Sequence, residues 1–269
     1  MRQVDSQNNP LEQAGYVEFC GAHIYSVLHG VADPVARVLL VGPFASERYV
    51  SYVPWVRWAR FLAARQIEAL RFDYRGVGES TGVFEDMSFG SWNEDVEFLA
   101  RWLKGRSPDV PLILHGLELG ALLASKTFAN GVGDALLLWA APTNANEVLR
   151  RPLSRQVFMS FNERKPLADY VRQLETDQPL EVEGYPWSGR LWRESFKFEA
   201  PLAKGDEASA AWDCGRPVRL VKLDGSPASV LRGSSLGFPV SLNPDLSGLF
   251  ADNFEWMAKT LAVPQERRQ

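Results

Sequence analysis

One five-residue segment of this chain holds an ionisable side chain between two glycines. Gly116-Leu117-Glu118-Leu119-Gly120 follows an apolar run that ends at His115 and precedes a run of small and apolar residues. This context predicts a strand, a sharp turn and a helix, the arrangement in which a G-x-S-x-G segment exposes a nucleophilic serine. Here the central residue is Glu118, so the segment predicts a strained turn that carries a carboxylate. The flanking glycines would allow the strand and the helix to approach closely.

The residues that would activate a nucleophile are missing from the expected positions. In a serine triad of this type the order along the chain is Ser, then Asp or Glu, then His. The three histidines, His23, His29 and His115, all precede the turn, and the C-terminal third of the chain has none. We expect His115 to be a hydrogen-bonded core residue, and the other two to lie roughly 14 Å away, about three strand spacings.

The carboxylate of Glu118 limits the chemistry available at the turn. Attack of a carboxylate on an ester would give a mixed anhydride, and an ester intermediate on saturated carbon would need water activated by a histidine. Glu118 could instead act as a general base or bind a cationic group. A position at a helix N-terminus favours negative charge, so we expect Glu118 to be ionised.

Alternating apolar runs and helical patterns place this turn in a larger sheet. Strands are expected at 16–20, 23–28, 35–41, 67–72, 111–115, 134–140, 218–223 and 239–242. Helices are expected at 50–65, 91–105, 118–129 and 253–261, the second with a capping box formed by Ser91 and Glu94. The alternation across 35–141 predicts a mostly parallel, eight-stranded α/β sheet with helices on both faces.

The chain divides into a tail, one domain and an insertion. Residues 1–14 are expected to be a loose tail, and residues 15–269 a single domain. The segment 143–212 is rich in charged and aromatic residues and predicts a helical cap over the carboxyl ends of the strands. Tyr185, Trp187 and Trp192 would wall a pocket with Glu118 at its floor, or would instead pack the cap onto the core. Basic residues within 147–165 predict a solvated cap face, with an anion site as the alternative.

Composition excludes several classes of function. A net charge of −4 argues against a nucleic-acid-binding protein, which would need a basic surface. Two cysteines without C-x-x-C spacing predict neither a disulfide framework nor a zinc site, and no metal or cofactor is expected. The N-terminus lacks the apolar region of a signal peptide, and no apolar run reaches the roughly 18 residues of a membrane span. We therefore expect a cytoplasmic protein whose partner is a small-molecule ligand or substrate.

Two further motifs carry a resemblance to a known superfamily. The segment from Asp73 to Ser80, Asp-Tyr-Arg-Gly-Val-Gly-Glu-Ser, follows a predicted strand, and Gly42-Pro43-Phe44-Ala45 follows another. With the turn at Glu118, these motifs resemble the α/β-hydrolase superfamily, in particular the serine aminopeptidase and lysophospholipase-like group. The resemblance implies an α/β-hydrolase fold with an oxyanion hole built from the backbone N–H groups of Phe44 and Leu119. The first motif is expected to shape its loop without taking part in chemistry.

The same resemblance shows which triad positions are altered. Relatives carry their acid in an Asp-Pro pair near Ser226-Pro227, and Asp224 is a substitute two residues earlier. Ser226 would then border the pocket. The chain is thus expected to be an altered, inactive hydrolase homologue. It would bind a ligand or partner through the pocket that holds the substrate in active relatives. The alternative is an active hydrolase-type enzyme that uses Glu118 as base or nucleophile, with Asp224, on a small ester, amide or sugar-like substrate.

A closer resemblance comes from shorter segments in the same order. Residues 25–29, 43–48, 116–124 and 183–185 are similar to hydrolase-like proteins associated with exosortase and exopolysaccharide gene clusters. This resemblance implies a bacterial protein linked to envelope or exopolysaccharide processes.

Overall fold

The computed structural model describes residues 11–43, 45–159, 165–199, 215–223 and 245–261. Its strands are β1 (Leu11–Phe19), β2 (Ala22–Gly30), β3 (Ala36–Val41), β4 (Ile67–Phe72), β5 (Leu112–Leu117), β6 (Ala135–Trp139), β7 (Leu180–Val182), β8 (Tyr185–Trp187) and β9 (Val218–Val221). Its helices are α1 (Ala45–Ala63), α2 (Phe89–Gly105), α3 (Leu119–Ala129), α4 (Ala145–Met159), α5 (Leu167–Glu175), α6 (Gly189–Ser195) and α8 (Ser247–Thr260), with a 3₁₀ turn, η1, at Phe84–Asp86.

The main sheet contains seven of the described strands in the order β1-β2-β4-β3-β5-β6-β9. β1 pairs with β2 and β2 with β4 in antiparallel fashion, and the remaining pairs are parallel. The mostly parallel sheet is therefore confirmed. The eighth strand expected at 239–242 lies outside the described residues.

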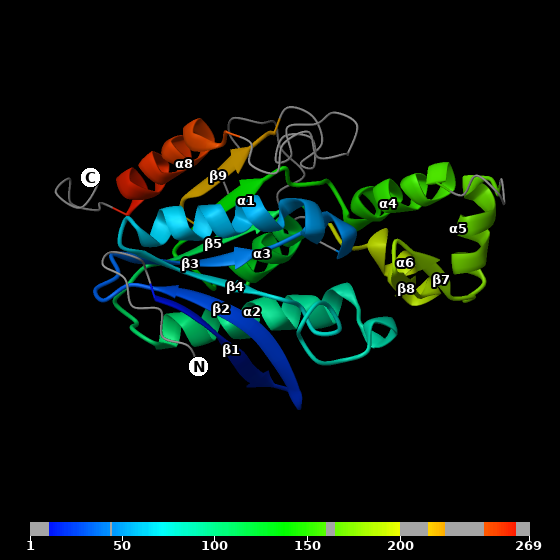
Figure 1. The fold of residues 1–269 in the computed structure, drawn as a ribbon, viewed down its shortest axis with the longest axis horizontal. Helices are drawn as coiled ribbons and strands as arrows, with labels where there is room; N and C mark the ends of the chain where they lie inside the picture. The colour runs from blue at the N-terminus through cyan, green and yellow to red at the C-terminus, as the bar shows by residue number, and fades with distance from the viewer. Residues whose placement is uncertain (1–10, 44, 160–164, 200–214, 224–244, 262–269) are drawn as a thin grey trace.

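Helices cover both faces of the sheet, as predicted, and the strand residues alternate between two cores. Leu39 and Val41 of β3 pack with α2 and α3, whereas Val38 and Leu40 pack with α1 and α8. Figure 1 shows these helices on either side of the strands. Because both faces of the sheet are covered, every residue of β3, β5 and β6 is buried, and most of these residues are apolar.

The inserted segment forms a compact cap between β6 and β9. Its helices α4, α5 and α6 accompany a two-stranded hairpin of β7 and β8. In Figure 1 the cap lies beyond the end of the sheet toward which the arrow of β3 points, so it sits over the carboxyl ends of the parallel strands. An isolated bridge between Asn144 and Glu199 joins the two ends of the cap. Residues 200–212 of the predicted insertion lie outside the described residues.

The loop after β4 has the structural role expected of it. The Asp73 carboxylate accepts two hydrogen bonds of 2.7 Å and 2.9 Å from Arg48 at one oxygen, and the backbone N–H of Glu79 donates to the other at 3.0 Å. Gly78 has a φ of +59°, and a Cβ atom there would lie 2.2 Å from an Asp73 oxygen. Only glycine fits this position, because the carboxylate is pressed against the backbone of its own loop.

Two local predictions were wrong. Residues 11–14 belong to β1, which pairs with β2 from Leu11 onwards, and are not part of a loose tail. The capping box of α2 uses Ser88 as the N-cap and Ser91 at the third helical position. Glu94, the expected partner of Ser91, instead accepts a hydrogen bond from Arg75. Ser91 takes the place of the Glu or Gln that usually completes a capping box. The spacing between Ser91 and Glu94 therefore placed the N-cap three residues too late.

Candidate functional site

The turn between β5 and α3 is strained and closely packed, as the sequence predicted. Glu118 lies between them with φ 52° and ψ −117°, in a region that L-residues rarely adopt. A Cβ atom on Gly116 would lie 2.4 Å from the Cα of Ala121, and one on Gly120 would lie 2.0 Å from the carbonyl oxygen of Val41. The glycines thus allow strand and helix to meet at a turn that fixes where the Glu118 side chain points.

The Glu118 carboxylate is buried and bound by an arginine of the cap. Only 1% of the residue is exposed, and its Oε1 accepts a short hydrogen bond from Arg151 of α4. Arg151 also reaches Glu147, one turn earlier on α4, at 3.3 Å. Among the described residues, Oε2 of Glu118 has no hydrogen-bond partner. The cap therefore places a guanidinium group directly against the carboxyl group at the turn.

A second arginine of α4 binds a second buried carboxylate beside the turn. Arg155, one helical turn after Arg151, contacts Glu47 at 2.6 Å and Glu183 at 2.8 Å. Glu47 lies in the first turn of α1 and is 4% exposed, whereas Glu183 precedes β8 in the cap. The two arginines thus join the cap to the two helix starts that border the turn.

The basic residues at the centre of the cap are partly exposed, but they also pair with buried carboxylates, which the prediction of a solvated face did not include. Arg151 and Arg155 turn toward the core because buried carboxylates of α1 and the turn lie within reach. Sequence reasoning missed Glu47 and Glu183 as their partners. The available signal was the i,i+4 spacing of the two arginines, which places both on one face of α4.

The surroundings of Glu118 favour its protonated form. The pKa of Glu118 is raised to about 8, chiefly by burial and also by the nearby carboxylate of Glu47, whereas Arg151 and Arg155 oppose the rise. The sequence predicted an ionised carboxylate on the strength of the helix N-terminus alone. That prediction left out desolvation, which is the largest contribution to the shift.

This pKa gives the stability of the protein a specific dependence on pH. Since the folded protein holds the Glu118 proton more tightly than the unfolded chain, the contribution of Glu118 to stability is present at low pH. It is lost as pH rises from about 4.5 towards about 8. We expect the free energy of unfolding of the wild type, relative to Glu118→Gln, to fall by on the order of 1 kcal/mol per pH unit in this window. Urea denaturation of both proteins from pH 5 to pH 8 measures this difference. A difference that stays flat or grows would contradict it.

The other predicted catalytic groups are only partly described. Leu119 begins α3, and its backbone N–H is one of the N-terminal donors that have no partner within the helix. Phe44, the second expected oxyanion donor, lies outside the described residues, as do Asp224 and Ser226. Within the described part of the chain no three or more His, Cys, Asp or Glu side chains gather as a metal site.

The three histidines lie on the strands of the main sheet, His115 on β5 and the other two on β2. His115 is fully buried on the α1 and α8 side of the sheet and accepts a 2.9 Å hydrogen bond from Trp58, so it is the core residue that was predicted. Burial holds its pKa well below the usual range. His23 and His29 lie on β2, which β4 and β3 separate from β5.

The three aromatic residues of the cap differ in their surroundings. Trp187 and Trp192 are each 1% exposed and belong to the core that packs against α2 and α3. Tyr185 is half-buried beside Phe84, with ring centroids 5.1 Å apart. Burial and a hydrogen bond to Tyr49 raise the pKa of Tyr185. The tryptophans thus attach the cap to the core, which favours the second of the two roles considered for them.

Solved structures share this architecture. The esterase Est1E of Butyrivibrio proteoclasticus, with bound ferulic acid, has a TM-score of 0.57 and 16% identity, covering 93% of this chain and 100% of its own. The monoglyceride lipase of Saccharomyces cerevisiae, in complex with a substrate analogue, has a TM-score of 0.59 and 15% identity, covering 96% and 98%. Mouse alpha/beta hydrolase domain-containing protein 10 has a TM-score of 0.58 and 15% identity, covering 92% and 99%.

This chain has the α/β-hydrolase fold. The mostly parallel seven-stranded sheet with helices on both faces agrees with these similarities. At identities of 15–16% the similarity establishes the fold alone. No protein-family model matches the sequence, and no curated protein matches it. In the described part of this α/β-hydrolase chain, none of the helices combines the length and the apolar character needed to cross a membrane.

Proposed function

We propose that this protein is a non-hydrolytic α/β-hydrolase homologue that acts by binding a small molecule. In this proposal the carboxyl group of Glu118, at the turn between β5 and α3 (the elbow), holds the cap in place. The observation that carries the proposal is the short contact between the guanidinium of Arg151 and the buried carboxyl group of Glu118. A hydrolase needs a nucleophile that faces the substrate. Here Glu118 stands at the position of the nucleophile, and Arg151 is bound directly to its side chain.

The chemistry of a carboxylate supports this proposal. Hydrolysis through Glu118 would form an anhydride or an ester on the protein, and its breakdown would need an activated water. All three histidines of the chain precede the turn. The hydrogen bond from Arg151 also occupies a lone pair of Oε1 of Glu118, which makes this oxygen a weaker nucleophile.

The similar structures support a small-molecule partner. Est1E binds ferulic acid, and the yeast lipase binds a substrate analogue. By analogy of fold, a concave surface near the carboxyl ends of the strands is the expected place for a ligand.

A second candidate function rests on the raised pKa of Glu118. A carboxyl group that is protonated near neutral pH can act as a general acid or base, so an enzyme acting on a small ester, amide or sugar-like substrate is the alternative. This alternative requires Arg151 to move away from Glu118 when substrate binds.

Restoring the serine alone is expected to leave the protein inactive. Glu118→Ser supplies a hydroxyl group without a base, and such a hydroxyl remains a weak nucleophile. The variant should show no labelling by a fluorophosphonate probe above that of Glu118→Ala, measured by mass spectrometry of the intact protein. Labelling of the introduced serine would reveal a base close to the turn and would argue against the non-hydrolytic proposal.

We further propose that the protein is cytoplasmic and serves a bacterial envelope or exopolysaccharide system, since its short motifs resemble proteins of such systems. In its native cell, loss of the gene should reduce exopolysaccharide. Complementation by Glu118→Gln should restore it if the role is non-catalytic. Restoration by the wild type alone would favour the enzymatic alternative.

A further inference from the structure

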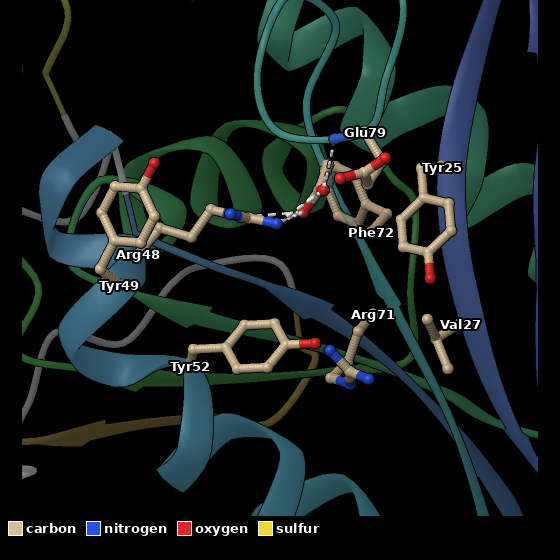
Figure 2. A pocket seen from close by; sticks show the side chains of 9 residues that line it. Tyr25, Val27, Arg48, Tyr49, Tyr52, Arg71, Phe72 and Glu79 are labelled. Atoms are coloured by element: carbon tan, nitrogen blue, oxygen red, sulfur yellow. Dashed lines mark hydrogen bonds and ion pairs between the residues drawn. The ribbon is translucent and has the colours of Figure 1, made fainter. Parts of the chain in front are cut away.

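A separate cavity opens between the sheet and the first half of α1. It has a volume of about 460 Å³ and contains none of the residues that form the two ion-pair clusters at the elbow. Figure 2 shows the side chains of β2, β4, α1 and the loop after β4 that surround it. Its lining residues are three tyrosines, two arginines, two carboxylates and two apolar residues: Tyr25, Tyr49, Tyr52, Arg48, Arg71, Asp73, Glu79, Val27 and Phe72.

One of the two arginines is already neutralised by a carboxylate. Arg48 contacts both oxygens of Asp73, each at 2.7 Å, and its guanidinium carbon lies 5.8 Å from the centre of the Tyr52 ring. A planar guanidinium bound to both carboxylate oxygens is a strong and fixed pair. Arg48 and Asp73 thus form a polar wall of the cavity with no net charge.

The other arginine keeps its charge. Arg71 donates through Nε to the Nε2 of His29 at 3.0 Å and forms no ion pair with any carboxylate in the described ranges. Burial and the neighbouring Arg71 lower the pKa of His29 to about 4, so His29 is neutral and acts as an acceptor. Glu12, which lies 3.5 Å from the other ring nitrogen of His29, is paired with Arg60. Arg71 is therefore oriented by a neutral group and, within the described ranges, has no carboxylate as a direct partner.

Two tyrosine side chains line the cavity together with Arg71. In Figure 2 the hydroxyl group of Tyr52 points toward Arg71, and the hydroxyl group of Tyr25 points toward Val27 on the same side of the cavity. The Arg71 guanidinium carbon also lies 5.5 Å from the centre of the Tyr52 ring. A guanidinium group with a hydroxyl donor beside it suits a planar anion such as a carboxylate.

The carboxylate of Glu79 limits where the ligand can carry negative charge. Glu79 is exposed and lies on the opposite side of the cavity from Arg71 in Figure 2. Solvent screens this carboxylate more than it screens half-buried Arg71. A second negative charge next to Glu79 would be repelled, so the ligand should have one anionic end and an uncharged body that lies against the tyrosine rings.

We propose that this cavity is a binding site for a small monocarboxylate carried on a ring, with Arg71 and Tyr52 holding the carboxylate. The ring can be a saturated sugar or a planar aromatic group, because tyrosine faces pack against either. The site is independent of the elbow and of the proposed function.

Isothermal titration calorimetry with two pairs of probes tests this site. Glucuronate and 4-hydroxybenzoate carry the carboxylate on a sugar and on an aromatic ring, and glucose and 4-hydroxybenzamide are their uncharged counterparts. We expect at least one acid to bind, with at least tenfold higher affinity than its uncharged counterpart. The acid that binds identifies the ring class.

Variants separate the site from general charge effects. Arg71→Gln should weaken binding of the acid at least tenfold, whereas Arg101→Gln, which removes an exposed arginine of α2, should leave it unchanged. Glu118→Gln should also leave it unchanged, so that a failure of this site is distinguishable from a failure of the proposed function. Circular dichroism establishes that each variant is folded.

Three results would overturn the assignment. They are the absence of binding by both acids at millimolar concentration, equal binding of acid and uncharged counterpart, and unchanged affinity in folded Arg71→Gln. Should Arg71→Gln fail to fold, Tyr52→Phe is the second variant. Since Tyr52 is exposed, this variant should fold and weaken binding several-fold, and unchanged affinity would again contradict the proposal.

Discussion

Replacing Arg155 with alanine is expected to lower the free energy of unfolding by about 2–3 kcal/mol. The reason is the carboxylate of Glu47, which is 4% exposed and would lose the guanidinium that neutralises it. Glu183 would lose the same partner, although solvent can replace part of that contact. Urea denaturation, followed by tryptophan fluorescence, measures the loss.

A matched arginine elsewhere in the cap serves as the control. Arg172 of α5 pairs with Asp169 at 3.2 Å, and their side chains are 72% and 43% exposed. Arg172→Ala should therefore change stability by less than about 1 kcal/mol. If the two substitutions lower the free energy of unfolding by the same amount, the contacts of Arg155 stabilise the fold no more than an exposed ion pair does.

Adding a single methyl group at Gly120 is expected to be still more damaging. The Cβ atom of Gly120→Ala would lie 2.0 Å from the carbonyl oxygen of Val41 and 2.5 Å from that of Gly42. Both obstacles are backbone atoms, so no side-chain rotation can relieve the clash. We expect a loss of at least about 3 kcal/mol, measured by the same denaturation or seen as a loss of folded protein.

Gly248 in α8 is the control for this substitution. A Cβ atom there would meet no atom within 4 Å, and alanine is the better helix former. Gly248→Ala should leave stability unchanged or raise it by up to about 1 kcal/mol. A Gly120→Ala protein as stable as Gly248→Ala would contradict the close approach of α3 to β3.

The parts of the fold that were predictable are those that depend on local sequence. Continuous apolar runs at β3, β5 and β6 reflect strands covered on both faces, and the glycines around Glu118 reflect a local steric requirement. The start of β1 was missed, because its residues 11–14 are mostly polar or small. These residues form a strand because they pair with β2, and no apolar alternation in the sequence indicates that pairing.

The candidate site was harder to predict because its partners come from distant segments. Glu47, Glu118 and Arg155 are separated by 71 and 37 residues, and nothing near any of them indicates the others. The ionisation of Glu118 depends on burial, and a rule for an isolated helix terminus leaves out the desolvation that raises its pKa. The ion pairs of this site and the pKa of Glu118 thus depend on residues that are distant in the sequence.

Hydrolysis of short p-nitrophenyl esters by the wild type and by Glu118→Gln tests most directly whether the elbow carboxylate is structural. If Glu118 serves to hold Arg151, neither protein should hydrolyse the esters above the rate of the buffer. Turnover by the wild type that disappears in folded Glu118→Gln would contradict the account and would show that Glu118 is catalytic.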